Sequence, residues 1–181
     1  MRKTLLLPLA CALALAAPTG AGLARTTARV TQADHQRVLR KIARYRMTAW
    51  RLESLVMARR TPSSGAAWRL RDYRFRVHVL LGWRRRATAV WRRFSNPPNE
   101  AAWECIHRGE GAWDGNTGNG FYGGLQMDLE FQRTYAPRFL LRKGTADRWT
   151  RLEQIWVAER ARQGGRGFYP WPNTARACGL I

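Results

Sequence analysis

Acidic residues are scarce in this chain, which carries 12 Asp and Glu against 32 Lys and Arg and has a formal net charge of +20 at pH 7. Histidine is scarcer still. The three histidines, His35, His78 and His107, show no spacing typical of metal ligands. We therefore expect neither a metal site nor a cofactor, and the charge favours anionic partners.

Long hydrophobic runs are also rare. The longest, residues 5–17, is too short to span a bilayer comfortably, and it follows the basic residues Arg2 and Lys3. The small-x-small pattern Gly-Leu-Ala at 22–24 then offers a cleavage site, so residues 1–24 are predicted to be a secretory signal peptide. We expect a secreted protein that has no transmembrane segment after removal of this signal.

Cysteine occurs three times, and signal removal would take Cys11 away. Cys105 and Cys178 would remain, and an even count in an oxidising compartment favours a disulfide. That bridge would close a loop of 74 residues, which stabilises a fold by about 4 kcal/mol in the chain-entropy model. Two buried free thiols are the alternative.

The excess positive charge lies in the N-terminal half. Residues 25–99 contain 19 Lys and Arg against three acidic residues, whereas residues 100–181 contain 11 against nine. Apolar residues recur there at spacings of three and four, which predicts two amphipathic helices. The break at 61–65, Thr-Pro-Ser-Ser-Gly, predicts an antiparallel helical hairpin. The predicted apolar stripes are Val38, Ile42, Tyr45, Ala49, Leu52 and Val56 on the first helix, and Leu70, Tyr73, Val77, Leu80, Ala87, Trp91 and Phe94 on the second.

Three tryptophans, Trp50, Trp68 and Trp83, fall off these stripes, and some of them are expected to pack on the rest of the protein. The basic residues have almost no glutamate to pair with, so we expect a polyanion-binding surface rather than an ordinary solvated helix face. Nucleic acid is disfavoured as the partner, because the signal peptide and the predicted disulfide indicate export.

The C-terminal half has a different pattern. Residues 95–99, Ser-Asn-Pro-Pro-Asn, form a boundary, and helices are predicted at about 100–108, at 129–141 with a perturbation at Pro137, and at about 147–163. Trp103 should pack inward, whereas Glu104 and Glu159 should be ion-pair or surface residues. Glycine-rich residues 116–120 predict tight turns, and residues 121–126 predict a short strand. The expected fold class is α+β, mostly α, with a short β-hairpin.

The segment Asn-Thr-Gly-Asn-Gly-Phe-Tyr-Gly-Gly-Leu-Gln at residues 116–126 resembles the core motif of the resuscitation-promoting factor, or transglycosylase-like, domain. The resemblance extends over residues 99–181 and includes Gln154, the segment 157–160, the Trp171-Pro172 pair and Cys178. It implies a small lysozyme-like catalytic domain that acts on peptidoglycan glycan strands, preceded by the basic hairpin of residues 25–98. It also implies that Thr117 and Gln126 contact the substrate.

The catalytic glutamate of that family directly follows the first cysteine, but Ile106 stands at this position here. Soluble lytic transglycosylases carry Glu-Ser-x-aromatic, followed by Gly-Leu-x-Gln, and residues 110–113, Glu-Gly-Ala-Trp, resemble that pattern with Gly111 in place of serine. Glu110 is therefore the candidate catalytic acid. The alternative is a solvated glutamate in a turn.

We thus expect an exported, cell-wall-associated lytic transglycosylase or muramidase that uses Glu110 as its one catalytic carboxylate. Asp114 and Asp128 lie nearby in sequence, but no motif supports either as a second one. Trp113 and Tyr122 are candidates for stacking on sugar rings, and anionic wall polymers are the expected partners of the basic hairpin. The alternative function is a non-catalytic module of the same fold that binds wall glycan.

Overall fold

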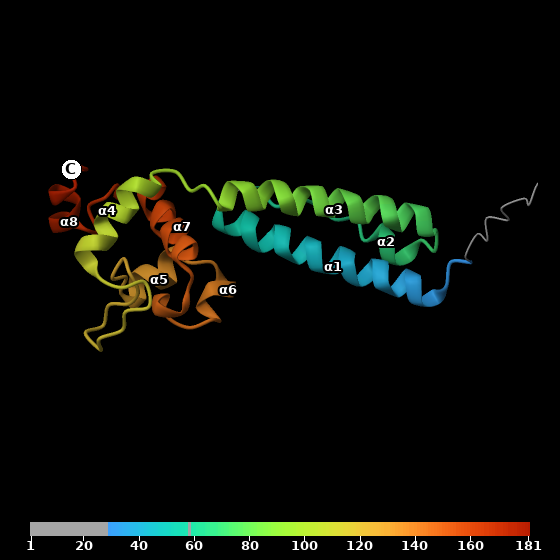
Figure 1. Ribbon diagram of the computed structural model, residues 1–181, viewed down its shortest axis with the longest axis horizontal. Coiled ribbons are helices and arrows are strands. Elements are labelled where there is room, and N and C mark those ends of the chain that lie inside the picture. The colour runs from blue at the N-terminus through green and yellow to red at the C-terminus, as the bar shows by residue number, and fades with distance from the viewer. Residues whose placement is uncertain (1–28, 58) are drawn as a thin grey trace, which may run out of the picture.

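The computed structural model describes residues 29–57 and 59–181, so the predicted signal peptide and Cys11 lie outside the described residues. An elongated helical arm, residues 29–94, projects from a rounded C-terminal part (Figure 1). None of the helices in these two described ranges is long and apolar enough to cross a membrane. The arm contains α1 (Gln32–Leu55), α2 (Ala66–Arg69) and α3 (Tyr73–Phe94), and the C-terminal part contains α4 (Glu100–Glu110), α5 (Leu129–Tyr135), α6 (Arg138–Leu141), α7 (Arg151–Ala161) and α8 (Pro172–Ala177).

The two long helices of the arm run parallel, so the predicted antiparallel hairpin is wrong. Near the start of α1, His35 lies 2.8 Å from Arg76, which is near the start of α3. Near the end of α1, Glu53 pairs with Arg86 at 2.6 Å. Figure 1 shows the chain leaving α1 at the C-terminal part and returning along the arm before α3 begins. The return segment, residues 59–65, passes back along α1, because Thr61 contacts Trp50 and Ser63 contacts Arg46.

Contacts with α1 hold this return segment in place. The indole Nε1 of Trp50 donates to the carbonyl oxygen of Thr61 at 2.8 Å, and the hydroxyl of Thr61 donates to Glu53 at 2.6 Å. Arg46 lies between two tryptophans, with its guanidinium 4.9 Å from the Trp50 ring centroid and 4.4 Å from that of Trp68. Residues 62–64, Pro-Ser-Ser, do not form a tight turn, because these contacts with α1 hold the backbone in an extended path.

The tryptophans of the arm correct two further expectations. Trp83 is buried in the arm's own core, edge-on to Trp50 with centroids 5.8 Å apart, and neither of them packs on the C-terminal part. Trp91, expected in the apolar stripe, is 53% exposed, and Leu70 is 50% exposed. The buried face of α3 runs instead through Trp83, Ala87, Val90 and Phe94, and Trp91 is rotated by about 100° from Val90 on that helix.

The base of the arm shares a hydrophobic core with the C-terminal part. This shared core includes Leu55 and Phe94 from the arm, and Trp103 and Trp156 from α4 and α7. The indole Nε1 of Trp156 donates to the carbonyl oxygen of Phe94 at 2.8 Å. A second, smaller cluster around Val38, Ile42, Ala49 and Trp83 lies farther along the arm. The base of the arm and the C-terminal part are thus packed around one hydrophobic core.

Helix starts and stops in the C-terminal part follow local chemistry. The predicted helix 129–141 is split into α5 and α6, because Ala136 precedes Pro137 and adopts an extended backbone (φ −82°, ψ 139°). The predicted helix 147–163 begins later, at Arg151, where Thr150 and Glu153 form a capping box. After α7, residues Arg162–Arg166 form a π-helical turn. These boundaries leave α7 as the central buried helix.

Polar pairing around α4 agrees with the sequence expectations. Trp103 is fully buried, and its indole Nε1 donates to the buried carboxylate of Glu159 at 2.7 Å. Glu159 also pairs with Arg162 at 3.0 Å, so it has the structural role expected of it. Glu104 and Glu100 both pair with Arg151 at the start of α7. These contacts fix α4 against α7 and so determine where α4 ends.

Candidate active site

Glu110 is the last residue of α4, two residues beyond the position where the sequence predicted this helix to end. Its side chain is half-buried, and its Oε1 accepts a hydrogen bond from the Thr174 hydroxyl of α8 at 2.7 Å. A β-carbon on Gly109 would lie 2.6 Å from Cγ2 of Thr174. Glycine at 109 is therefore what lets α8 approach closely enough for Thr174 to reach the carboxylate.

A disulfide fastens α8 to α4 beside this contact. Cys105 lies in α4 and Cys178 caps the end of α8, and their Cα atoms are 6.1 Å apart. The half-buried Thr174 is on the same short helix as Cys178. The bridge therefore links the helix that carries Glu110 to the helix that positions its side chain.

The glycine-rich segment after Glu110 forms turns held by two isolated bridges, in place of the continuous strand expected at 121–126. Tyr122 pairs with Met127 through two backbone hydrogen bonds of 3.0 and 3.1 Å, and Tyr122 also bridges to Asn116. Residues 123–126 make the tight turn between Tyr122 and Met127. At its corner, Gln126 adopts a left-handed backbone (φ 45°) that is uncommon for a residue with a side chain.

The side chain of Gln126 lies next to the end of α4. Its Nε2 atom would be 3.6 Å from a β-carbon placed on Gly111, the residue after Glu110. The same Nε2 donates to the carbonyl oxygen of Gly123 at 2.9 Å, and the Oε1 atom is 3.5 Å from Nδ2 of Asn119. The turn thus places an amide beside Gly111, the residue that follows the candidate acid, and an amide is a suitable group for hydrogen bonding to a sugar.

Gln154, a fully buried amide on α7, holds the turn from beneath. Its Oε1 accepts from the backbone N–H of Gly124 at 2.9 Å, and its Nε2 donates to the carbonyl oxygen of Trp113 at 2.7 Å. A β-carbon on Gly123 would lie 2.4 Å from Oε1 of Gln154, and one on Gly124 would lie 2.6 Å from Nδ1 of His107. The glycine pair is therefore required for close packing of this turn on α4 and α7.

The other residues predicted to contact substrate differ in their surroundings. Trp113 is half-buried and stacks on His107, with ring centroids 4.1 Å apart at an angle of 19°. Tyr122 is half-buried and packs against the shared core, whereas Thr117 is exposed in the loop. Asp114 is exposed, and Asp128 caps α5 by accepting from the backbone N–H of Phe131 at 2.7 Å. The structure thus brings Gln126 next to Gly111, the residue after Glu110, and leaves Thr117 exposed in the loop.

Three residues around the site were given no role by the sequence argument: His107, Gln154 and Thr174. Gln154 carried the clearest signal, because it is an amide within the mostly apolar run of α7. Thr174 had no signal, because its contact with Glu110 joins residues 64 positions apart. Within residues 29–57 and 59–181, no three His, Cys, Asp or Glu side chains are grouped so that they could hold a metal ion.

Part of this chain, including the residues around Glu110, is similar to known proteins. Residues 98–174 match the family model described as a transglycosylase-like domain. Over 85 residues the chain is 41% identical to the resuscitation-promoting factor RpfB of Mycolicibacterium smegmatis (strain ATCC 700084 / mc(2)155). That alignment covers 42% of this chain and 21% of the relative, so the likeness concerns about a fifth of the relative's length.

Proposed function

We propose that this chain, whose residues 98–174 form a transglycosylase-like domain of the resuscitation-promoting-factor type, is an exported enzyme that cleaves the glycan strands of peptidoglycan. In this proposal, residues 1–24 are a signal peptide, residues 25–98 a basic helical region and residues 99–181 the catalytic domain. The protein then acts outside the cell, on the wall.

One observation carries the assignment of the catalytic residue. The Glu110 carboxylate is half-buried at the end of α4 and is oriented by the Thr174 hydroxyl, and the Gln126 amide lies beside the next residue, Gly111. A carboxyl group needs this combination of fixed orientation and neighbouring hydrogen-bonding groups to act on a bound sugar. Glu104 on the same helix does not have it, because that side chain is paired with Arg151.

The chemistry uses one carboxyl group twice. Protonated Glu110 donates its proton to the glycosidic oxygen, the bond from C1 to that oxygen breaks, and positive charge develops at C1. The carbonyl oxygen of the substrate's N-acetyl group stabilises C1. The Glu110 carboxylate then removes a proton from the C6 hydroxyl, whose oxygen bonds to C1 and closes an anhydro ring. Glu110 is protonated again at the end of the cycle. If water attacks C1 in place of the C6 hydroxyl, the same residue performs a muramidase reaction.

The surrounding residues supply binding. Gln126 and Thr117 are proposed to form hydrogen bonds with the glycan. Trp113 and Tyr122 are proposed to contact the faces of sugar rings with their side chains. No second carboxylate is assigned. Asp128 is occupied as the cap of α5, and a substrate-assisted path does not require one.

The test is the release of soluble fragments from purified sacculi, analysed by mass spectrometry. The parent should release disaccharide-containing fragments. Glu110→Gln should reduce the rate by roughly 10²- to 10⁴-fold, the usual contribution of a general acid, with an unchanged melting temperature. Glu104→Gln on the same helix is the matched control and should retain nearly full activity, because its partly exposed ion pair contributes little.

The product and the control variants separate the alternatives. Fragments one water lighter than hydrolysed ones identify the anhydro product and hence transglycosylation. Binding of the parent to sacculi without release of fragments would instead support the glycan-binding module. Undiminished release by Glu110→Gln would show that another residue is the acid.

A further inference from the structure

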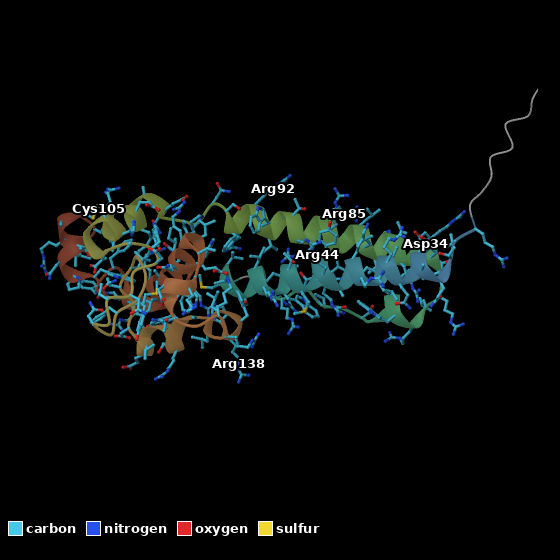
Figure 2. The ribbon with its side chains drawn as sticks, turned by 60° about the horizontal axis from the view of Figure 1, so that its bottom comes forward. Asp34, Arg44, Arg85, Arg92, Cys105 and Arg138 are labelled. Carbon is cyan, nitrogen blue, oxygen red and sulfur yellow. A yellow bond between two sulfur atoms is a disulfide. The ribbon has the colours of Figure 1, made fainter. Side chains whose placement is uncertain are left out.

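We infer that the outer face of α3 is a docking surface for a linear phosphodiester polymer of the cell wall. This outer face consists of Leu81, Arg84, Arg85, Thr88, Ala89 and Arg92, which together line a shallow groove. Figure 2 shows Arg85 and Arg92 along the edge of the arm formed by α3. The inference goes beyond glycan cleavage, because it concerns a different part of the molecule and a different ligand.

Packing leaves this side of α3 free. One side, through Trp83, Ala87 and Val90, is buried in the arm. A second side, through Val79, Gly82 and Arg86, lines a cavity together with residues 61–68, which end in α2. The residues of the groove lie on the remaining side, and Arg84 and Arg85 are both exposed.

The charge of α3 is of one sign. The helix Tyr73–Phe94 carries seven arginines and no acidic residue. Within the described residues, the only ion pairs of the arm are Arg37 with Asp34 and Arg86 with Glu53. Arg84, Arg85 and Arg92 thus present guanidinium groups that no carboxylate of the described chain neutralises. Guanidinium groups bind phosphate oxygens through paired hydrogen bonds.

The spacing of these arginines suits a polymer rather than a single small anion. Arg85 and Arg92 are seven residues apart, two helical turns, which places them about 10 Å from each other along the helix axis. A chain with repeated phosphate charges can contact both, whereas one phosphate group cannot.

A lipid surface fits this face less well. Helices that lie on membranes present a broad apolar stripe to the acyl chains. The apolar stripe of α3 is already buried against α1, and only Leu81 and Ala89 are apolar in the groove. A wall polymer is the occupant that the charge and the shallow shape support, and it would concentrate the enzyme on its proposed substrate.

The experiment measures binding of the full chain to sacculi at low salt. Sacculi are prepared either with their phosphodiester polymers or after acid treatment that removes these polymers. The test variant changes Arg84, Arg85 and Arg92 to Glu. Arg86 is left intact, because it pairs with the buried Glu53. Two control variants carry the same charge change elsewhere: Arg133, Arg138 and Arg142 to Glu on the C-terminal part, and Arg40, Lys41 and Arg44 to Glu on α1. All six of these control residues are exposed.

The α3 variant should bind untreated sacculi roughly 10- to 100-fold more weakly than the parent, since the local field that concentrates the polymer is reversed. Both control variants should stay within about threefold of the parent, and parent and α3 variant should bind stripped sacculi equally. Circular dichroism checks that each variant is folded. Because binding and not cleavage is measured, the result does not depend on whether Glu110 is catalytic.

Several outcomes would overturn the inference. Parent-like binding of untreated sacculi by the α3 variant would remove the role of this face. An equal loss in either control variant would show that only net charge matters. A difference between parent and α3 variant that persists on stripped sacculi would make the glycan or peptide the ligand. Tighter binding of the parent to anionic phospholipid vesicles than to sacculi would indicate a membrane partner.

Discussion

At the residue scale, the contact between Thr174 and Glu110 links the proposed acid to an element 64 residues away in sequence, at 2.7 Å. A hydrogen bond to a carboxylate restricts its rotamers, and small misplacement of a catalytic group is costly. Thr174 therefore acts as a positioning residue in the proposed reaction. Its methyl group fills the space left by Gly109, so the hydroxyl can be tested separately from the packing.

Thr174→Val keeps the shape of the side chain and removes the hydroxyl. We expect kcat for release of glycan fragments to fall by roughly tenfold, as for the loss of about 1.4 kcal/mol of transition-state stabilisation, with KM and the melting temperature nearly unchanged. Thr174→Ser, which restores the hydroxyl, should recover most of kcat. If Thr174→Val keeps the parent kcat while Thr174→Ser loses it, the methyl group and not the hydrogen bond is what matters.

The site shows what could and could not be predicted at this scale. Glu110 could be placed near the end of a helix because glycines stand on both sides of it, although α4 continues through Gly109 and ends before Gly111. The neighbourhood of Gln126 could not, because the left-handed backbone at this residue (φ 45°) has no local sequence signal. The roles of Gln154 and Thr174 arise only when α7 and α8 pack on α4, and contacts of that range are invisible to periodicity.

At the scale of elements, the arm shows why the predicted hairpin was wrong. The helices themselves were predictable from apolar spacing, but their relative direction depends on the connection between them. The break at 61–65 was interpreted as a tight turn from its Pro, Ser and Gly content. In the structure, the Thr61 hydroxyl donates a hydrogen bond to Glu53 and the Thr61 carbonyl accepts one from Trp50. The guanidinium of Arg46 stacks on the Trp68 ring. Side chains of α1, not the residues of the break, decide the path of the chain.

The buried Glu53 makes this arrangement sensitive to pH. Burial disfavours its carboxylate, but hydrogen bonds from the hydroxyl and backbone N–H of Thr61 and from Arg86 outweigh burial and hold the pKa of Glu53 below its ordinary value. The pKa is lower in the folded than in the unfolded state. The ionised group therefore stabilises the fold above the ordinary glutamate pKa, and this contribution is lost as the pH falls through the folded-state pKa.

Glu53→Gln tests this linkage. The parent should melt well above the variant at pH 7, and the difference should shrink as the pH is lowered below about 4. Glu130→Gln, at an exposed position, is the control and should follow the parent at every pH. A difference between parent and Glu53→Gln that stays constant from pH 7 to pH 3 would show that the carboxylate charge is not what stabilises the return segment.

The disulfide is the second element-scale device. A six-residue helix such as α8 is too short to be stable by itself, and the Cys105–Cys178 bridge fastens it to α4. Reduction, or the double change of Cys105 and Cys178 to Ser, should lower the free energy of unfolding by about 4 kcal/mol. Denaturant unfolding with and without reductant measures this, and reductant should not affect the double variant. Unfolding of the parent that is insensitive to reductant, or two thiols that alkylate freely in the native protein, would contradict it.

At the scale of the whole molecule, two clusters of buried residues divide the arm. Its base belongs to the core of the C-terminal part, whereas its distal half has a core of its own. The sequence predicts a boundary between the two parts at residues 95–99, because the two prolines of that segment stop the preceding helix. Packing across the boundary is set by Leu55 and Phe94 meeting Trp103 and Trp156, and no pattern within either half reveals it.

A matched pair of truncations tests this division. Leu55 and Ile42 are both aliphatic and at most 1% exposed, but Leu55 lies in the shared core and Ile42 in the distal cluster. Each change to Ala should cost about 2–5 kcal/mol locally. Hydrogen exchange of the amides in α7, Arg151–Ala161, is the measurement, because Trp156 of this helix packs in the shared core and binds the carbonyl of Phe94. Leu55→Ala should speed exchange in α7, whereas Ile42→Ala should speed exchange in the distal part of α1 and leave α7 protected. Equal protection of α7 in both variants would mean that the C-terminal part folds independently of the arm, and that a chain starting at Ser95 should then keep the full stability of that part.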